Sequence, residues 1–323
     1  MATSRSWRQH TVDGPYRARL DEIGELNQIF SDSFTERYRR DGMVGVRVPF
    51  LNPVIWRYAI EDADDGALLW RDERGHIVAF NMVHQSGKEG WMGPLAVRTE
   101  FQGAGTGKEI VMRGIEWLKD RRASVIGLET MPRTMDNIGF YSRLGFHPGK
   151  LTITTTLEAA YGDPAATLFG RLSPRARDDA LAECRALVQS LSAGYDYTRE
   201  ITLTHELSLG DTVLLYDGDT LIGFALAHTA PLVEGRAREE LRVLKLVLGD
   251  ESRFGDIVGA IADFARRSGT RRVALRLQGE FLGAYRHVIA LGGHVRWTDL
   301  RMSLTDYGEK RPERGLVLSN WEI

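Results

Sequence analysis

An internal repeat constrains the fold of this chain more than any other feature. Residues 68–84 contain two apolar runs joined by a polar turn, and residues 214–228 contain the same arrangement. The two stretches end on His84 and His228, which lie 144 positions apart. Two apolar runs around a turn rich in glycine and aspartate are typical of a β-hairpin. The repetition predicts two copies of one domain, and the matching histidines reflect that repeat, since two histidines in separate domains make a poor metal site.

The same order of elements continues through both halves. After the hairpin, the first half is expected to form a strand at 95–97, a helix around 111–118, a strand at 125–128, a helix at 140–145 and a strand at 151–157. The counterparts are 246–248, 257–264, 272–277, 285–293 and 295–304, and the helices 21–34 and 175–191 open the two halves. This order predicts an α/β fold (α+β, mixed sheet) in two domains, 1–162 and 163–323, joined near Tyr161–Pro174.

Composition excludes several classes of protein. The formal net charge is −2 and the pI is about 6.5, so no electrostatic surface for nucleic acid or an acidic membrane is expected. The polar first ten residues do not form a signal peptide, and no apolar run is long enough for a membrane span, so a cytoplasmic location is expected. The single cysteine, Cys184, excludes an intramolecular disulfide and is expected in the core.

A glycine-rich loop is the strongest chemical signal. Residues 102–108, Gln-Gly-Ala-Gly-Thr-Gly-Lys, follow the apolar run 95–97 and open an amphipathic helix. Glycines allow a phosphate to approach the backbone closely. The first N–H groups of a helix lack partners within the helix, and its dipole adds partial positive charge there. The segment therefore predicts an anion site that suits a pyrophosphate.

Two common phosphate motifs do not fit this loop. A Walker A loop requires Gly at position 102 and Ser or Thr at position 109, where the chain has Gln102 and Glu109. A dinucleotide fingerprint beginning at Gly103 requires a third glycine at Lys108. The pattern Gln/Arg-x-x-Gly-x-Gly/Ala fits in full.

A second motif accompanies the first. Asn137 lies 35 residues after Gln102, and Phe140-Tyr141 and Leu144-Gly145-Phe146 follow it. With both motifs in this order, residues 16–157 resemble the GNAT superfamily of acyl-CoA N-acyltransferases. The resemblance implies acetyl-CoA, or another acyl-CoA, as co-substrate and no metal. It also implies a cofactor site made of Leu95, Ala96, Val97, Gln102, Gly103, Ala104, Gly105, Thr106, Gly107, Lys108, Asn137 and Tyr141.

The resemblance also suggests catalytic roles. Tyr141 is the candidate general acid toward the CoA sulfur, although it could instead serve as an aromatic anchor. A backbone N–H near Val97 would polarise the thioester carbonyl. Glu129 is the candidate general base and Glu89 the runner-up; either could be a solvated carboxylate at a strand end, and the amine could lose its proton through water.

The second copy lacks the glycine-rich loop at the corresponding position. Residues 249–255 carry Asp250 and Glu251 in place of glycines, and Phe254 fills space that a glycine would leave open. Negative charge repels a pyrophosphate, so this half is predicted not to bind CoA but to support the first half or wall the acceptor pocket. Residues 315–323 are expected to add a last strand.

The resulting functional expectation is acetyl transfer to a primary amine of a small molecule, with a homodimer compatible with the sequence. Transfer of another acyl group, transfer to a hydroxyl, and acyl-CoA sensing without turnover remain alternatives. Acidic residues in the first helix, Asp21, Glu22 and Glu25, would suit a cationic amine or form an ordinary polar helix face. The connection Met131–Asp136 could shape the acceptor pocket.

Overall fold

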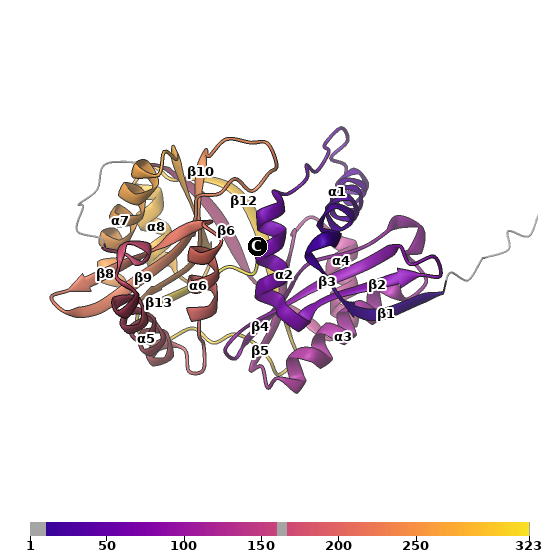
Figure 1. Ribbon diagram of the computed structural model, residues 1–323, viewed down its shortest axis with the longest axis horizontal. Helices are drawn as coiled ribbons and strands as arrows, with labels where there is room; N and C mark the ends of the chain where they lie inside the picture. Colours follow the sequence, from indigo (N-terminus) through magenta and orange to yellow (C-terminus); the bar gives the residue numbers. More distant parts are fainter. Residues whose placement is uncertain (1–10, 160–166, 323) are drawn as a thin grey trace, which may run out of the picture.

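The computed structural model describes residues 11–159 and 167–322 (Figure 1). The predicted boundary between residues 162 and 163 lies outside the described residues, as do the first ten residues and Ile323. Elements of the first half are β1 (Val12–Arg17), α1 (Ile23–Arg40), α2 (Pro53–Ala63), β2 (Ala67–Asp72), β3 (Ile77–Ser86), β4 (Glu89–Val97), α3 (Thr106–Asp120), β5 (Val125–Thr130), α4 (Met135–Arg143) and β6 (Phe146–Glu158).

Elements of the second half are β7 (Thr167–Leu168), α5 (Pro174–Leu191), α6 (Thr198–Glu206), β8 (Gly210–Asp217), β9 (Thr220–His228), β10 (Glu240–Leu248), α7 (Phe254–Arg267), β11 (Arg272–Gln278), α8 (Leu282–Ala290), β12 (His294–Leu304) and β13 (Leu316–Ser319). The predicted hairpins are β2–β3 and β8–β9, and the predicted mixed α/β order is confirmed in both halves. The sequence analysis missed β1, β7, α2 and α6. The expected last strand is confirmed, because β13 pairs with β10.

One continuous sheet joins the two halves. Its strand order is β1-β2-β3-β4-β5-β12-β6-β11-β10-β9-β8-β7, with β13 beside β10. Strand β12 of the second half lies between β5 and β6 of the first, and β6 lies between β12 and β11. Each half thus completes its sheet with a strand of the other, β12 in the first half and β6 in the second. The halves lie side by side in Figure 1 with α2 at their junction.

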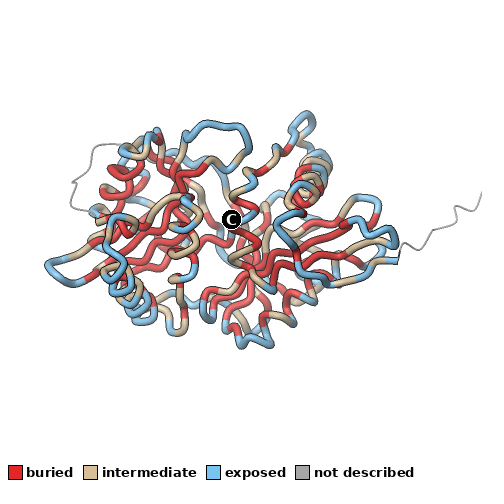
Figure 2. The backbone as a smooth tube through the Cα atoms, in the orientation of Figure 1, coloured by how far each residue is buried: buried red, intermediate tan, exposed pale blue. Residues whose placement is uncertain are grey.

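Helices cover both faces of the sheet. Along β3, Phe80 and Met82 pack on one face with α1 and α2, whereas Ala79 and Val83 pack on the other face with α3. This alternation follows from the two-residue period of a strand. In the second half, α5 and α6 extend the first layer and α7 and α8 form the opposite one. Figure 2 shows buried residues along the strands and exposed residues on the loops and outer helix faces.

Local sequence explains where several helices begin. Ser173 precedes Pro174 and accepts a hydrogen bond from the Ala176 backbone N–H at the start of α5. Asn52 precedes Pro53 and caps α2 in the same way. A capping side chain followed by proline satisfies an unpaired helix N–H and presets the first helical φ angle.

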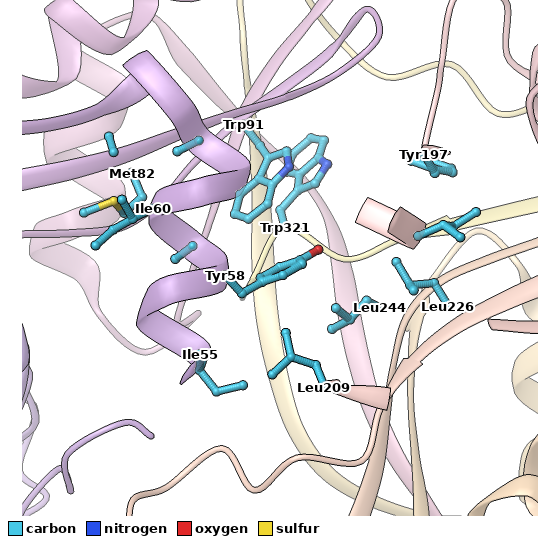
Figure 3. Close-up of a cluster of buried hydrophobic side chains, with 14 of the residues drawn as sticks. Ile55, Tyr58, Ile60, Met82, Trp91, Tyr197, Leu209, Leu226, Leu244 and Trp321 are labelled. Carbon is cyan, nitrogen blue, oxygen red and sulfur yellow. The ribbon is translucent and has the colours of Figure 1, made fainter. Parts of the chain in front are cut away.

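The core on the α1–α2 face is continuous between the halves. Figure 3 shows Tyr58 of α2 and Trp91 of β4 in a cluster with Leu244 of β10 and with Trp321, which follows β13. Trp321 occupies space that the lack of a side chain at Gly127 leaves free: a Cβ there would lie 2.2 Å from its ring. A larger residue at 127 would therefore displace the anchor of the C-terminal segment.

Strands β4 and β5 determine where the site forms. They pair in parallel from Glu89↔Val125 to Met92↔Leu128. Beyond Met92, β4 continues to Val97 and still pairs with β3. Strand β5 no longer pairs with β4 there. The separation of the two strands opens one edge of the sheet at Leu95–Val97.

Candidate active site

A cleft of about 430 Å³ lies where β4 leaves β5. Its walls are α1, the end of β4, the glycine loop, the start of α3 and one side of α4. Ten of the twelve predicted cofactor residues line it: Leu95, Ala96, Val97, Gln102, Gly103, Gly105, Gly107, Lys108, Asn137 and Tyr141. Ala104 and Thr106 do not. The structure thus brings together two motifs that lie apart in the sequence.

The glycine loop has a backbone that few other residues would adopt. Gly103 and Gly105 have φ angles of +83° and +94°, in the left-handed region. A Cβ at either position would meet no heavy atom within 4 Å, so the space beside the loop is open. Helix α3 begins directly after Gly105 and directs its first N–H groups toward this end. This geometry is that of an anion site at a helix N-terminus.

Gln102 connects the loop to its surroundings. Its Nε2 donates to the Val97 carbonyl at 2.9 Å, and its Oε1 accepts from Arg40 Nη1 at 3.1 Å. Ser33 Oγ donates to the same Val97 carbonyl at 3.3 Å. Gln102 therefore fixes the loop against β4 and α1 as well as lining the cleft.

Two arginines of α1 add cationic groups that the sequence analysis missed. Arg37 and Arg40 both line the cleft. Arg37 pairs with Asp41 at 2.5 Å and Asp136 at 3.1 Å, and Arg40 pairs with Glu36 at 2.9 Å. No local pattern links them to a loop about sixty residues later, and both lie beyond the helix predicted at 21–34, which α1 extends to Arg40.

Tyr141 lies in α4 with 6% of its surface exposed. Its ring packs against Phe140 and Phe146, with centroids 5.2 and 6.1 Å away, while it also lines the cleft. Burial raises the pKa of its phenol above the ordinary value of 10. The phenol therefore keeps its proton at neutral pH, as a general acid must, and the packing also suits an anchor.

Glu129 does not lie in the cleft, which argues against its predicted role as a base. Its carboxylate is buried between Arg276 at 2.5 Å and Arg301 at 2.8 Å, and it accepts a hydrogen bond from Thr152. Burial opposes the charge, but the two guanidiniums dominate and lower the pKa of Glu129 to about 2. A carboxylate with so low a pKa is a weak base, and Glu129 instead connects the halves.

Like Glu129, Glu89 is buried and held by residues of the second half. Its carboxylate is fully buried and accepts hydrogen bonds from Trp321 Nε1 at 2.8 Å, Ser319 Oγ at 2.9 Å and the Tyr197 hydroxyl at 3.0 Å. Three donors from the second half thus hold it away from the cleft. Neither predicted carboxylate lies beside the cofactor loop.

The acidic residues of the first helix are also engaged. Glu22 pairs with Arg71 and accepts from the Arg19 backbone N–H at 2.8 Å. Glu25 accepts from the Ile77 backbone N–H at 3.0 Å and pairs with Arg98. These contacts fix the start of α1 to the sheet, whereas Asp21 pairs with the exposed Arg19 at 3.0 Å. Asp21, Glu22 and Glu25 do not line the cleft, and a role in acceptor binding stays a prediction.

Comparison with known proteins identifies the first half. Residues 25–146 match the Acetyltransferase (GNAT) family. The chain contains a GNAT-family domain. The matched range includes both motifs and most of the cleft, and GNAT domains are acyltransferases that use acyl-CoA. No curated protein sequence matches this chain.

Solved structures extend the GNAT fold to the whole chain. A putative acetyltransferase from Pyrococcus horikoshii has a TM-score of 0.66 at 15% identity, covering 99% of this chain and 98% of its own. A tandem GNAT protein from the clavulanic acid biosynthesis pathway has a TM-score of 0.59 at 13% identity, covering 93% and 100%. N-myristoyltransferase of Saccharomyces cerevisiae has a TM-score of 0.63 at 8% identity, covering 94% and 85%. The predicted tandem GNAT-like fold is therefore confirmed.

The second GNAT-like half fills the position of the glycine loop with its own side chains. The Asp250 carboxylate accepts a hydrogen bond from the Ser252 backbone N–H at 2.8 Å, and Glu251 pairs with Arg311 at 2.8 Å. Phe254 is buried against His287. Groups that would meet a phosphate in the first half are occupied here, and the absence of CoA binding by this half stays a prediction.

Residues 11–159 and 167–322 contain no cluster of three or more histidine, cysteine or acidic side chains that could hold a metal ion. His84 instead contacts Asp62 at 2.6 Å and stacks on Trp91, while His228 contacts Thr204 at 2.9 Å. In the same described part, every helix is too short or too polar to cross a bilayer.

Proposed function

We propose that this GNAT protein is an acyl-CoA-dependent N-acyltransferase that transfers an acetyl group from acetyl-CoA to a primary amine of a small molecule. The observation that carries the proposal is the single cleft that contains the glycine loop, the free end of β4 and Tyr141. The loop and α3 would hold the pyrophosphate, with Arg40 and Lys108 supplying positive charge. The backbone of Leu95–Val97 would hold the pantetheine arm.

In the proposed reaction, the amine nitrogen attacks the thioester carbon directly. The N–C bond forms, the C–S bond breaks, and the electron pair of that bond leaves with sulfur. Tyr141 gives its phenolic proton to the sulfur and regains one from solvent. The N–H near Val97 stabilises the negative charge on the carbonyl oxygen. The proton lost by the amine leaves through water, because neither Glu129 nor Glu89 lines the cleft.

A thermal shift assay with acetyl-CoA, longer acyl-CoAs, NAD and ATP tests the cofactor. A ligand present at about 100 times its Kd adds about 2.7 kcal/mol to the free energy of unfolding. Selective stabilisation by acyl-CoA, followed by thiol release with an amine panel, is the expected result. Absence of a shift with every CoA would mean that the loop is only a structural turn.

A longer acyl group is the alternative to acetyl, because N-myristoyltransferase, which was solved with bound myristoyl-CoA, has a similar fold. A longer acyl-CoA that outcompetes acetyl-CoA in the same assay would select that alternative. Turnover with alcohols in place of amines would select a hydroxyl acceptor. Binding of acyl-CoA without turnover of any acceptor would favour the alternative of an acyl-CoA sensor.

A further inference from the structure

One buried carboxylate of the first half is not used by the function described so far. Asp41 is the first residue after α1, and only 6% of its side chain is exposed. It lies outside the set of residues that line the cofactor cleft, although its partner Arg37 belongs to that set. A carboxylate removed from water is costly unless it is paired and hydrogen-bonded. The partners of Asp41 therefore show which parts of the molecule it holds together.

On the side of α1, Asp41 binds Arg37. The guanidinium donates from Nη2 to one carboxylate oxygen at 2.5 Å and from Nε to the other at 3.2 Å. Such a two-point contact fixes the orientation of both groups. Arg37 also reaches α4, because its Nη1 donates to Asp136 Oδ2 at 3.1 Å. Arg37 thus joins Asp41 to the wall of the cleft that α4 forms.

On the side of α4, Asp41 binds Thr134. The Thr134 hydroxyl donates to Asp41 Oδ2 at 2.8 Å, and the Thr134 side chain is fully buried. Thr134 directly precedes α4, the position from which a threonine side chain usually accepts a hydrogen bond from a backbone N–H of the helix. Among the described residues it makes no such cap, and its hydroxyl serves a contact between residues 93 positions apart. Helix α4 thus lacks a local stabilising contact and has a fixed position against α1.

A third contact comes from the same connection between β5 and α4. Arg133 Nη2 donates to the Asp41 backbone carbonyl at 2.7 Å. This carbonyl lies at the C-terminal end of α1, where the partial negative charge of a helix favours a cation. The connection therefore holds the end of α1 at several points. We call the contacts of Asp41 with Arg37, Arg133 and Thr134 the α1–α4 clamp.

Helix α4 depends on tertiary contacts for its position. It has nine residues, and isolated helices shorter than about 12 residues are marginal in water. Besides the clamp, it packs on β6, where the Tyr141 ring contacts Phe146. Asn137, Phe140 and Tyr141 of this helix line the cleft. A shift of α4 would therefore move the proposed general acid relative to the glycine loop and β4.

The clamp and the glycine loop are held by different residues. Gln102 holds the loop by donating to the Val97 carbonyl and accepting from Arg40. Asp41 holds the other end of the cleft through the start of α4. Loss of the clamp should therefore disturb the position of Tyr141 more than the site proposed for the pyrophosphate.

We propose that Asp41 is a positioning residue for acyl transfer: by holding Arg37 and Thr134 it fixes the separation of α1 and α4 across the cleft, and with it the alignment of Tyr141 with the thioester sulfur. This inference rests on the proposed function, in which Tyr141 is the proton donor. Asp41 lies outside the cleft and acts through Tyr141. A displacement of about 1 Å in a reacting group can lower a rate about 100-fold. The clamp should therefore affect kcat and have much less effect on acyl-CoA affinity.

The first test removes one hydroxyl from the clamp in the full-length chain. Thr134→Val keeps the shape of the side chain and removes the donor to Asp41, whereas Thr134→Ser keeps the donor. With the best amine of the acceptor panel, we expect kcat of Thr134→Val to fall about tenfold and that of Thr134→Ser to stay within about threefold of the wild type. Kd for acetyl-CoA, measured by calorimetry, should change less than about threefold in both variants. Equal kcat in Thr134→Val and the wild type would overturn the inference.

The second test changes the carboxylate itself. Asp41→Asn keeps an acceptor for the Thr134 hydroxyl but removes the charge with which Arg37 pairs. Its kcat should fall at least as far as that of Thr134→Val, again with Kd for acetyl-CoA nearly unchanged. A rise in Kd without a fall in kcat would mean that Asp41 supports cofactor binding and not the chemical step, which contradicts the inference.

The second half offers a matched control. Asp196 binds Arg185 at 2.7 Å and accepts from the hydroxyl of Thr198, the first residue of α6, at 2.7 Å. Neither Asp196 nor Thr198 lines the cleft. Asp196→Asn and Thr198→Val should therefore leave kcat unchanged even where the melting temperature falls. An equal loss of kcat in these variants would show that lower stability, and not the position of α4, slows the reaction.

A double-mutant cycle separates positioning from a general loss of stability. If Asp41 acts through Tyr141, Asp41→Asn should lower kcat by less than about twofold once Tyr141→Phe has removed the phenol. A residue that only stabilises the fold would lower kcat by the same factor in both backgrounds. Equal factors would therefore refute the positioning role.

The outcomes distinguish this inference from the proposed function. Failure of acetyl-CoA to stabilise the wild type would remove the acyltransferase proposal and this inference with it. Binding and turnover by the wild type, together with unchanged kcat in Thr134→Val and Asp41→Asn, would keep the function and exclude the positioning role. A loss of kcat in both variants that disappears in the Tyr141→Phe background would support both proposals.

Discussion

At the residue scale, removal of the Tyr141 hydroxyl tests whether this residue is a general acid or only an aromatic anchor. Tyr141→Phe keeps the ring that packs against Phe146 and removes only the proton donor. We expect kcat to fall about 100-fold, the lower end of general-acid contributions, with acyl-CoA affinity within about twofold of the wild type. Steady-state kinetics and calorimetric binding measure the two quantities.

The matched control is Tyr216→Phe, which removes a hydroxyl that donates to Glu183 in the second half. Its kcat should equal that of the wild type. If Tyr141→Phe also keeps full kcat, Tyr141 is an anchor and the leaving thiolate takes its proton from elsewhere.

For Glu129 we expect the opposite result: its replacement should lower the free energy of unfolding and leave kcat nearly unchanged. Glu129→Gln leaves Arg276 and Arg301 buried without the charge that both contact. Removing one partner of a buried ion pair costs about 3–5 kcal/mol in the free energy of unfolding. Urea unfolding should show this loss at pH 7, while kcat of the remaining folded enzyme stays within about threefold.

The pH dependence checks the same residue. Because the pKa of Glu129 falls from 4.5 to about 2 on folding, its contribution is complete above about pH 4.5 and disappears as the pH falls toward 2. The difference between wild type and Glu129→Gln should therefore shrink over that window. Glu116→Gln, at an exposed ion pair with Arg113, should change stability by less than about 0.5 kcal/mol. A constant difference at all pH values would contradict the ion-pair explanation.

At this scale, the sequence predicts features that depend on local spacing and does not predict contacts between residues far apart in the chain. The shared cleft of Gly103, Gly105, Asn137 and Tyr141 could be anticipated because it depends on spacing within short segments. The partners of Glu129 lie 147 and 172 residues away, and no local pattern reports such a contact. A carboxylate at a strand end therefore resembled a solvent-facing base when it was part of a buried ion network.

At the scale of elements, α1 and the glycine loop act together through Arg40 and Gln102. Arg40→Ala should remove a cation from the cleft and the contact that holds Gln102. We expect Kd for acyl-CoA to rise about tenfold, and binding to depend less on salt, because a charge-assisted contact is worth about 1.5–3 kcal/mol. Titration calorimetry at two ionic strengths measures both effects.

Arg39→Ala provides a close control. Arg39 is adjacent, pairs with the same Glu36 and does not line the cleft. Its replacement should leave Kd unchanged. Equal losses in both variants would mean that the helix as a whole, and not the guanidinium of Arg40, supports the loop.

At the scale of the whole molecule, the exchanged strands make the halves depend on each other. Residues 1–162 alone would lack β12 between β5 and β6, and residues 163–323 alone would lack β6 beside β11. Each fragment would expose unpaired strand edges in the middle of a sheet. We expect neither fragment to unfold cooperatively in a thermal scan, whereas the two fragments co-expressed as separate chains should co-purify and unfold in one transition.

A cooperative transition in either fragment would show that β6 and β12 are dispensable. The exchange itself could not be predicted from the sequence, because the strands carry the same alternating pattern whichever partner they join. The repeat predicted two copies of a fold, and only the strand register shows which half completes which.

The position of β12 also sets an order of events during synthesis. A ribosome releases the glycine loop, Tyr141 and the whole of β6 long before residues 294–304 emerge. Until then the first half has a gap beside β5, and β6 lacks its partner on the β12 side, with β11 the only neighbour already made. The half that carries the cofactor cleft therefore cannot finish folding as it is made, and the nascent chain depends on its last few dozen residues before either half is complete.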